Sequence, residues 1–235
     1  MITVVNRSTS VSNADVQKMV RACAYQLKNH AAPAWGKTPI PVVYSVTEAT
    51  APPGSWVIGV FDTSDQAGAL GYHDVTSGDV VYGRVFARPV LDHGGDALTK
   101  ELSVASVLSH EVLETFVDPF CNLYADWDGI RAVALEVGDP VEADSYAVPV
   151  DGVKVTVSNF VTQRWFDPRA TTGPFDHMGN CKEPFAMTRG GYLIVMKEGG
   201  INQVFGDKYQ EWRIADLKES PLSRTARRMA LVAGR

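Results

Sequence analysis

The first part of the chain combines a short apolar stretch with a helical pattern. Residues 2–6 are mostly β-branched, which predicts a first strand. In residues 12–30, apolar side chains recur at i, i+3 and i+4, as on one face of a helix. Ser12 or Asn13 can cap this helix, and Pro33 and Gly36 are expected to end it. The apolar stripe consists of Val16, Met19, Val20, Cys23 and Leu27.

Further apolar stretches follow, separated by turn-forming segments that contain proline, glycine, serine and aspartate. A longer one, residues 98–117, predicts a helix that is apolar on nearly all sides, as is typical of a helix buried in a core. Pro119 should stop this helix, because the residue before a proline is pushed out of the α region. The shorter stretches predict strands at residues 41–46, 56–62, 69–73 and 80–91.

The second half of the chain has weaker helical signals. The order of elements predicts an α+β fold, in which residues 1–119 form a lobe with a mixed sheet, a backing helix and the buried motif helix. Residues 120–235 are expected to form an irregular lobe rich in strands and loops, with a basic C-terminal tail at residues 223–235. The two lobes are expected to pack as one compact unit. Predicted strands in the second lobe cover residues 130–135, 152–157 and 191–197, and the last of these forms a hairpin with residues 202–205.

Composition narrows the classes of partner. Of 235 residues, 45% are hydrophobic and 21% are charged, which is ordinary for a globular protein. The net charge of -5 argues against nonspecific nucleic-acid binding, so we expect no nucleic-acid partner. No window approaches the ~18 apolar residues of a membrane span, so no membrane partner is expected either.

The cysteine pattern and the first residues bear on localisation. Cys23, Cys121 and Cys181 are too few and too scattered for a disulfide framework or a C-x-x-C site. Residues 1–7 have neither the basic nor the apolar region of a signal peptide. We therefore expect the protein to be cytoplasmic when made, and incorporation into a virion stays open.

The most informative stretch is Ser109-His110-Glu111-Val112-Leu113-Glu114. His110 and Glu114 are four residues apart on the predicted helix, so they lie on the same face. An imidazole and a carboxylate placed in this way can bind one divalent metal ion. The pattern is that of the zinc metalloprotease helix H-E-x-x-H with its second histidine replaced by glutamate.

The motif extends beyond the helix and carries a resemblance to known proteins. After His110, Glu111 and Glu114 come Asp118-Pro119, then Trp127, and then Glu136-Val137-Gly138-Asp139. The chain resembles zincin-type metallopeptidases, and more narrowly a group of poorly characterised bacterial and phage proteins with H-E-x-x-E-x-x-x-D-P. Plant exordium-like proteins show a related pattern. The resemblance covers residues 100–165 and implies a zincin-like fold and a metal site, without a known substrate.

The same resemblance implies where a substrate and a third ligand would lie. In zincins a twisted sheet is backed by one helix, and a strand before the motif helix can pair with an extended peptide, which here points to residues 80–91. A downstream Glu as third ligand, with an Asp that orients a histidine, matches Glu136 and Asp139. Asp118 is the alternative ligand, although eight helical residues place it ~12 Å from His110. We favour Glu136.

The replacement of histidine by glutamate affects the expected metal. Two carboxylate ligands make the ion less Lewis acidic than in a site with two histidines. We expect zinc as the cofactor, but oxygen ligands also suit manganese, magnesium or calcium. Glu111 is the candidate general base, which would take a proton from the attacking water.

Two functions from different classes are compatible with these patterns. The first is a metal-dependent hydrolase of the zincin type that acts on peptide bonds in a peptide or protein substrate. The alternative is a non-catalytic phage virion or assembly protein that binds protein partners. In the plainest interpretation, His110 and Glu114 simply bond each other or the loop at Trp127. His73, His93 and His177 are predicted to be surface or loop residues rather than ligands.

Overall fold

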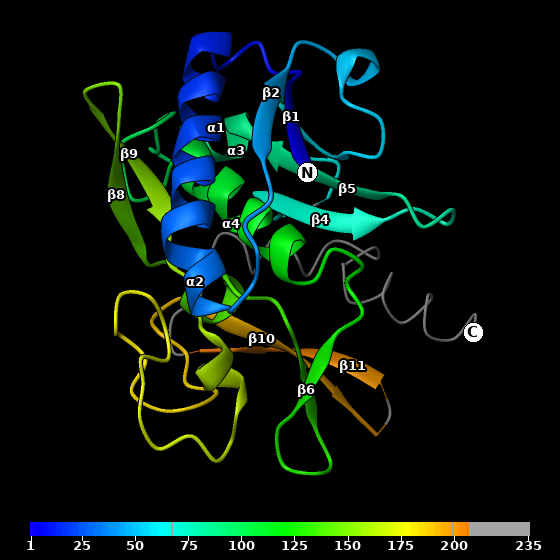
Figure 1. Ribbon diagram of the computed structural model, residues 1–235, viewed down its shortest axis with the longest axis vertical. Coiled ribbons are helices and arrows are strands. Elements are labelled where there is room, and N and C mark those ends of the chain that lie inside the picture. Colours follow the sequence, from blue (N-terminus) through cyan, green and yellow to red (C-terminus); the bar gives the residue numbers. More distant parts are fainter. Residues whose placement is uncertain (67, 199, 207–235) are drawn as a thin grey trace.

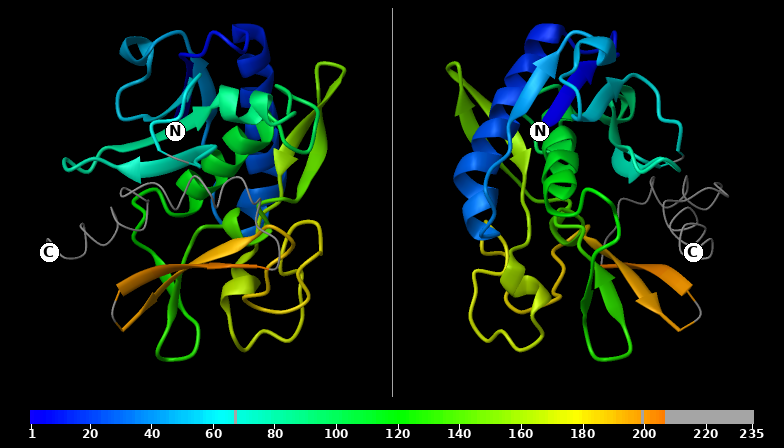
Figure 2. Two further views of the ribbon diagram at one scale, coloured as in Figure 1. Left: turned by 180° about the vertical axis from the view of Figure 1, so that it is seen from behind. Right: turned by 45° about the vertical axis from the view of Figure 1, so that its right-hand side comes forward.

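The computed structural model describes residues 1–66, 68–198 and 200–206. The described chain has an α+β fold with a five-stranded mixed sheet, a four-stranded sheet and a separate two-stranded hairpin. Figure 1 shows the five-stranded sheet in the upper part of the molecule and the four-stranded sheet in the lower part. In the right-hand view of Figure 2, the two long helices lie on one side of the five-stranded sheet. The predicted α+β class and mixed sheet are confirmed.

The five-stranded sheet has the order β2-β1-β3-β5-β4. Its first four strands are parallel, and β4 is antiparallel to β5, with His73 opposite Gly83. The strands were predicted from their β-branched and aromatic residues. Their bounds are Ile2–Asn6 (β1), Val42–Ser45 (β2), Trp56–Phe61 (β3), Gly71–Val75 (β4) and Val81–Phe86 (β5).

The edge of this sheet differs from the prediction. The stretch 80–91 was expected to be the edge strand, but β5 ends at Phe86 and the chain continues as α3 (Ala87–Asp92). β5 is an interior strand, because a tight turn in which the Thr76 N–H donates to the Val80 carbonyl folds β4 back along it. Among the described residues, β4 is therefore the edge strand nearest the motif helix.

Helix α1 (Asn13–Gln26) packs its predicted apolar stripe into the core. The Ser12 side chain caps it by accepting the Asp15 N–H. The helical path continues through a π-helical turn (η1, Leu27–Ala31) into the short α2 (Ala32–Ala34). The prediction of the helix end is correct for Gly36, which has a φ of +58° just after α2, as is typical of a residue that ends a helix. It is wrong for Pro33, since a proline in the first turn of α2 lacks only an N–H that needs no intrahelical partner.

The motif helix is α4 (Val104–Val117), and all fourteen of its residues are buried. It begins six residues later than predicted, because the Asp96 carboxylate accepts the N–H groups of residues 98, 99 and 100 and holds them in a non-helical turn. Ser103 then caps the helix through a reciprocal bond with Ser106. It ends at Val117 as predicted, and Asp118 before the proline has a non-helical backbone.

The second half supplies the four-stranded sheet, the two-stranded hairpin and two single-turn helices. The predicted hairpin between the last two described strands is confirmed, whereas two strands, β6 and β8, were not predicted. The basic tail at residues 223–235 lies outside the described residues. The elements of the second half are β6 (Tyr124–Asp126), β7 (Ala132–Ala134), η3 (Asp139–Val141), β8 (Ser145–Val150), β9 (Val153–Ser158), η4 (Gln163–Phe166), β10 (Tyr192–Lys197) and β11 (Gly200–Phe205). A further single-turn helix, η2 (Glu48–Thr50), lies in the first half.

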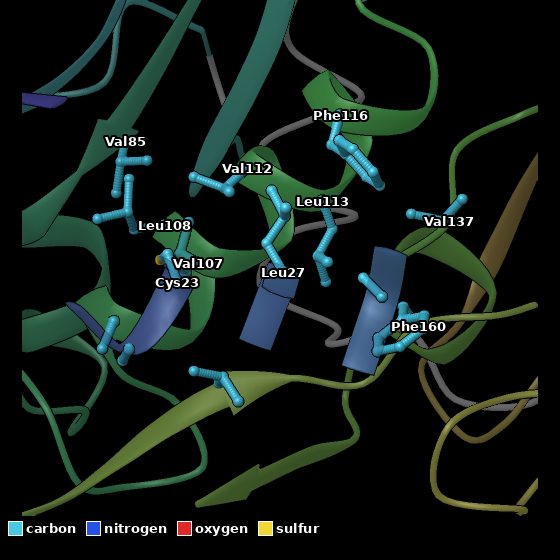
Figure 3. Close-up of a cluster of buried hydrophobic side chains, with 14 of the residues drawn as sticks. Cys23, Leu27, Val85, Val107, Leu108, Val112, Leu113, Phe116, Val137 and Phe160 are labelled. Atoms are coloured by element: carbon cyan, nitrogen blue, oxygen red, sulfur yellow. The ribbon is translucent and has the colours of Figure 1, made fainter. Parts of the chain in front are cut away.

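One cluster of buried apolar side chains connects the two halves of the chain. The cluster includes Leu27 after α1, Leu108 and Leu113 of α4, and Val137 and Phe160 from the second half, all labelled in Figure 3. α4 contacts α1, β4, β5 and β9, so its polar residues are enclosed from several directions. Within the described residues, we find no helix with both the length and the apolar character that crossing a membrane requires.

Candidate metal centre

α4 carries the three motif residues into the interior of the molecule. His110, Glu111 and Glu114 are 7%, 2% and 0% exposed. Since the apolar residues of α4 already pack against α1 and the large sheet, these polar side chains need partners from other elements. The partners come from strand β4 and from the segment that follows β7.

His110 lies between two carboxylates. Its Nε2 atom is 3.1 Å from Glu114 Oε1 and 3.2 Å from Asp139 Oδ1. Burial lowers the pKa of the His110 imidazole, but Glu114 and Asp139 outweigh it and raise that pKa well above its usual value. The backbone of Gly138 packs against the His110 ring. A Cβ atom added at this glycine would lie 2.5 Å from Nδ1.

The two downstream acids lie beside different histidines. Asp139 was expected to orient a histidine, and its Oδ1 atom lies 3.2 Å from His110 Nε2, so it is also placed to join the His110–Glu114 pair as a ligand. Glu136, the favoured third ligand, lies beside His73 instead. The chain turns sharply after β7 into η3, and the Gly138 N–H donates to Glu114 Oε1 over 3.3 Å. This turn, rather than the spacing of the motif, determines which acid faces His110.

His73 is a site residue that the sequence analysis missed. It was predicted to be a surface or loop residue, but it is 1% exposed, and its Nδ1 lies 3.5 Å from Glu114 Oε2 and 3.7 Å from Glu111 Oε2. The signal that could have identified it is its alternation with Gly71, which places both residues on one face of β4. His93 and His177 are exposed by their accessible surface, as predicted, although the His177 ring is partly covered where it stacks on His30 and Phe160.

Asp118, the alternative ligand, belongs to neither group of potential metal donors. Its carboxylate accepts the backbone N–H groups of Asn122 and Leu123 at 3.2 and 2.9 Å, which stabilises the turn after α4. Its carbonyl oxygen lies 3.1 Å from His73 Nε2. Asp118 therefore orients a histidine through its backbone. Trp127 stacks on Phe185, away from His110.

His110 and Glu111 line an open pocket of about 210 Å³. Strand β4 approaches α4 so closely there that a Cβ atom at Gly71 would lie 2.8 Å from Glu111 Oε1. Glu111 Oε2 is buried, and the described part of the chain provides no hydrogen-bond partner for it. Three further carboxylates line the same pocket, those of Glu101, Glu142 and Asp144.

The donor set fits a divalent cation. In a tetrahedral site with metal–ligand distances of ~2.0–2.2 Å, neighbouring donor atoms lie ~3.3–3.6 Å apart. The separations of 3.1 and 3.2 Å around His110 Nε2 need little adjustment to reach that range. One imidazole nitrogen with two carboxylate oxygens is a common donor set for zinc and manganese. Without an ion, the same atoms can share a proton on His110, which is the plainest interpretation of the motif.

Comparison of the chain with protein-family models, with curated proteins and with solved structures gave no match.

Proposed function

We propose that the protein is a metal-dependent hydrolase with a zincin-like fold that acts on peptide bonds. The observation that carries this proposal is the convergence of His110, Glu114 and Asp139 on one point, with Glu111 beside them at the wall of an open pocket. Buried imidazole and carboxylate groups that converge in a pocket are typical of a functional site.

His110, Glu114 and Asp139 would hold the ion, and zinc is the expected one. A bound divalent ion would act as a Lewis acid and lower the pKa of a water molecule at the site. Gly138 fixes the orientation of the His110 ring and also donates to Glu114 Oε1. The backbone at position 138 thereby positions two of the three proposed ligands.

Glu111 is the proposed general base. Glu111 lines the pocket, and its Oε2 atom makes no hydrogen bond among the described residues, so the carboxylate can accept a proton from the attacking water. The absence of a side chain at Gly71 leaves room for the Glu111 carboxylate between α4 and β4. The same carboxylate could pass the proton to the leaving amine, since it is then protonated and adjacent to the cleaved bond.

The position of strand β4 supports a peptide as substrate. β4 is an edge strand of the described sheet, and residues Leu70 and Gly71 at its start line the pocket. An extended peptide can add to such an edge through main-chain hydrogen bonds. Because Glu101, Glu142 and Asp144 also line the pocket, peptides with basic side chains should bind best.

The experiment that tests this function is incubation of the protein with a mixed peptide library and zinc, manganese or calcium. Wild-type protein should cleave a subset of the peptides. Glu111→Gln keeps the shape of the side chain and removes its basicity, so cleavage should fall by at least ~100-fold while the protein remains folded. If wild-type protein cleaves nothing with any of the three ions, the hydrolase proposal is wrong and a non-catalytic binding role is favoured.

A further inference from the structure

A second group of buried donor atoms lies on the other side of Glu114. It consists of His73 from β4, Glu114 from α4 and Glu136 from the turn after β7, which are at most 2% exposed. One donor atom from each residue lies within 4.8 Å of the others. The residues come from three separate elements, so their convergence is a property of the fold rather than of the motif helix.

The hydrogen bonding of His73 identifies its free nitrogen. Nε2 lies 3.1 Å from the Asp118 carbonyl oxygen, and because a carbonyl can only accept, Nε2 carries the proton. In the neutral ring, Nδ1 then has a lone pair. Among the described residues, this buried Nδ1 atom has no hydrogen-bond partner, and it faces Glu114 Oε2 and Glu111 Oε2 at 3.5 and 3.7 Å. A histidine that donates to a backbone carbonyl through one nitrogen commonly binds a metal through the other.

A lone pair that faces two carboxylate oxygens is repulsive unless a proton or a metal ion lies between them. Without an ion a proton fills this place: burial lowers the pKa of His73, but Cys121, Glu111 and Glu114 outweigh it and raise that pKa well above its usual value. A divalent ion would replace this proton. The separation of 3.5 Å between His73 Nδ1 and Glu114 Oε2 falls within the ~3.3–3.6 Å expected for two donors on one ion. Glu136, which is 2% exposed, has its Oε2 atom 4.0 Å from His73 Nε2, so its carboxylate can turn toward the same cation. The site therefore suits a divalent ion in both geometry and charge.

Glu114 belongs to both groups of donors. Its Oε1 atom faces His110 and its Oε2 atom faces His73, so the two oxygens of one carboxylate point to two different sites. A carboxylate that bridges two metals is a usual arrangement in two-metal hydrolases, where the ions are ~3.5–4 Å apart.

We propose that His73, Glu114 and Glu136 form a second divalent-cation site, and that Glu114 bridges it to the site formed by His110, Glu114 and Asp139. This proposal rests on the proposed hydrolase site, because it shares Glu114 with it. One imidazole and two carboxylates suit manganese and zinc, the two ions with which the site should be tested.

The test is the metal content of chelator-treated protein after it has been loaded with zinc or with manganese. Wild-type protein should retain two ions per chain. His73→Gln keeps a donor for the Asp118 carbonyl and removes the Nδ1 ligand, so this variant should retain one ion. Glu136→Gln should also retain one, and it provides the same test if His73→Gln does not fold. His93→Gln alters an exposed histidine and should retain two.

The manganese-loaded protein offers a second readout that a structural role of His73 would not produce. Two manganese ions joined by the Glu114 carboxylate should give an exchange-coupled paramagnetic resonance spectrum, and His73→Gln should restore the spectrum of an isolated ion. One ion per wild-type chain would overturn the proposal. If that ion is lost in His110→Asn, the hydrolase site stands alone; if it is lost in His73→Gln instead, the proposed hydrolase site is wrong as well.

Discussion

The imidazole of His110 lies directly against the backbone of Gly138, where a Cβ atom would come within 2.5 Å of Nδ1 and 2.6 Å of Cε1. Since real Cβ atoms do not approach a ring so closely, residue 138 can only be glycine while His110 keeps its position. This contact connects the motif helix to the turn that carries Asp139.

Gly138→Ala should therefore weaken metal binding. The added methyl group displaces the His110 ring from Glu114 and Asp139, and a displacement of this kind should cost at least ~10-fold in affinity. Titration of the metal-free protein with zinc measures the effect. Gly78→Ala is the matched control, because a Cβ atom there would meet only Thr76 Oγ1 at 3.9 Å. Equal affinities in the two variants would contradict the assigned role of His110.

Gly71→Ala should separate catalysis from metal binding. A Cβ atom at this position would lie 2.8 Å from Glu111 Oε1 and 2.9 Å from Val107 Cγ1, so the Glu111 carboxylate must move. The proposed ligands of the first site are not touched by this atom. We expect kcat for peptide cleavage to fall by ~10–100-fold, with unchanged zinc content at that site. If Gly71→Ala instead lost zinc but kept its activity per bound ion, the added methyl group would disturb the metal ligands rather than Glu111.

The third ligand can be identified by comparing two aspartates. Asp139→Asn should weaken zinc binding at the first site strongly, because Asp139 Oδ1 lies 3.2 Å from His110 Nε2. Asp118→Asn should leave zinc affinity nearly unchanged and lower the free energy of unfolding by about 1–2 kcal/mol, because its carboxylate accepts two backbone N–H groups. Calorimetric zinc titration and urea unfolding measure the two effects. If Asp118→Asn weakened zinc binding more than Asp139→Asn did, the metal site would instead lie at the end of α4.

The histidine pair His30 and His177 should contribute less to the stability of the fold in mild acid. His30 and His177 stack with ring centroids 4.6 Å apart. Burial lowers the pKa of both, and His30 lowers the pKa of His177 further, although Asp176 opposes this effect. The unfolded chain therefore binds protons more readily than the folded chain, so this contribution to stability is present above about pH 6.5 and is lost as the pH falls through the lowered pKa values.

NMR titration of the His177 ring should give a pKa below 6.5. In His177→Phe, which can still stack on His30 and Phe160, the melting temperature should fall less between pH 7.5 and 5.5 than it does in the wild type. A His177 pKa at or above 6.5 would contradict this account of the pair.

Much of the fold could be predicted because its elements carry regular patterns. The apolar stripe of α1 and the all-round apolar character of α4 predicted two buried helices, and β-branched runs predicted most strands. Strand β8 was missed because it contains Pro149 and has no regular alternation of polar and apolar residues. The start of α4 was misplaced because the turn at Asp96 depends on side-chain hydrogen bonds that propensity does not record.

The candidate site could be predicted only as far as a helix determines it. The four-residue spacing of His110 and Glu114 fixes their shared face. The choice between Glu136 and Asp139 depends on the turn into η3, and the place of His73 depends on strand order within the sheet. Both are tertiary features, because they arise from pairing and packing between segments that are distant in sequence.

The most direct test of the central claim is an anomalous difference map, measured at the zinc absorption edge from crystals of the protein loaded with zinc. If these three residues bind one zinc ion, the map should show a peak ~2.0–2.2 Å from each of His110 Nε2, Glu114 Oε1 and Asp139 Oδ1. A map without a peak at these three atoms, in which His110 remains hydrogen-bonded to both carboxylates, would contradict the claim.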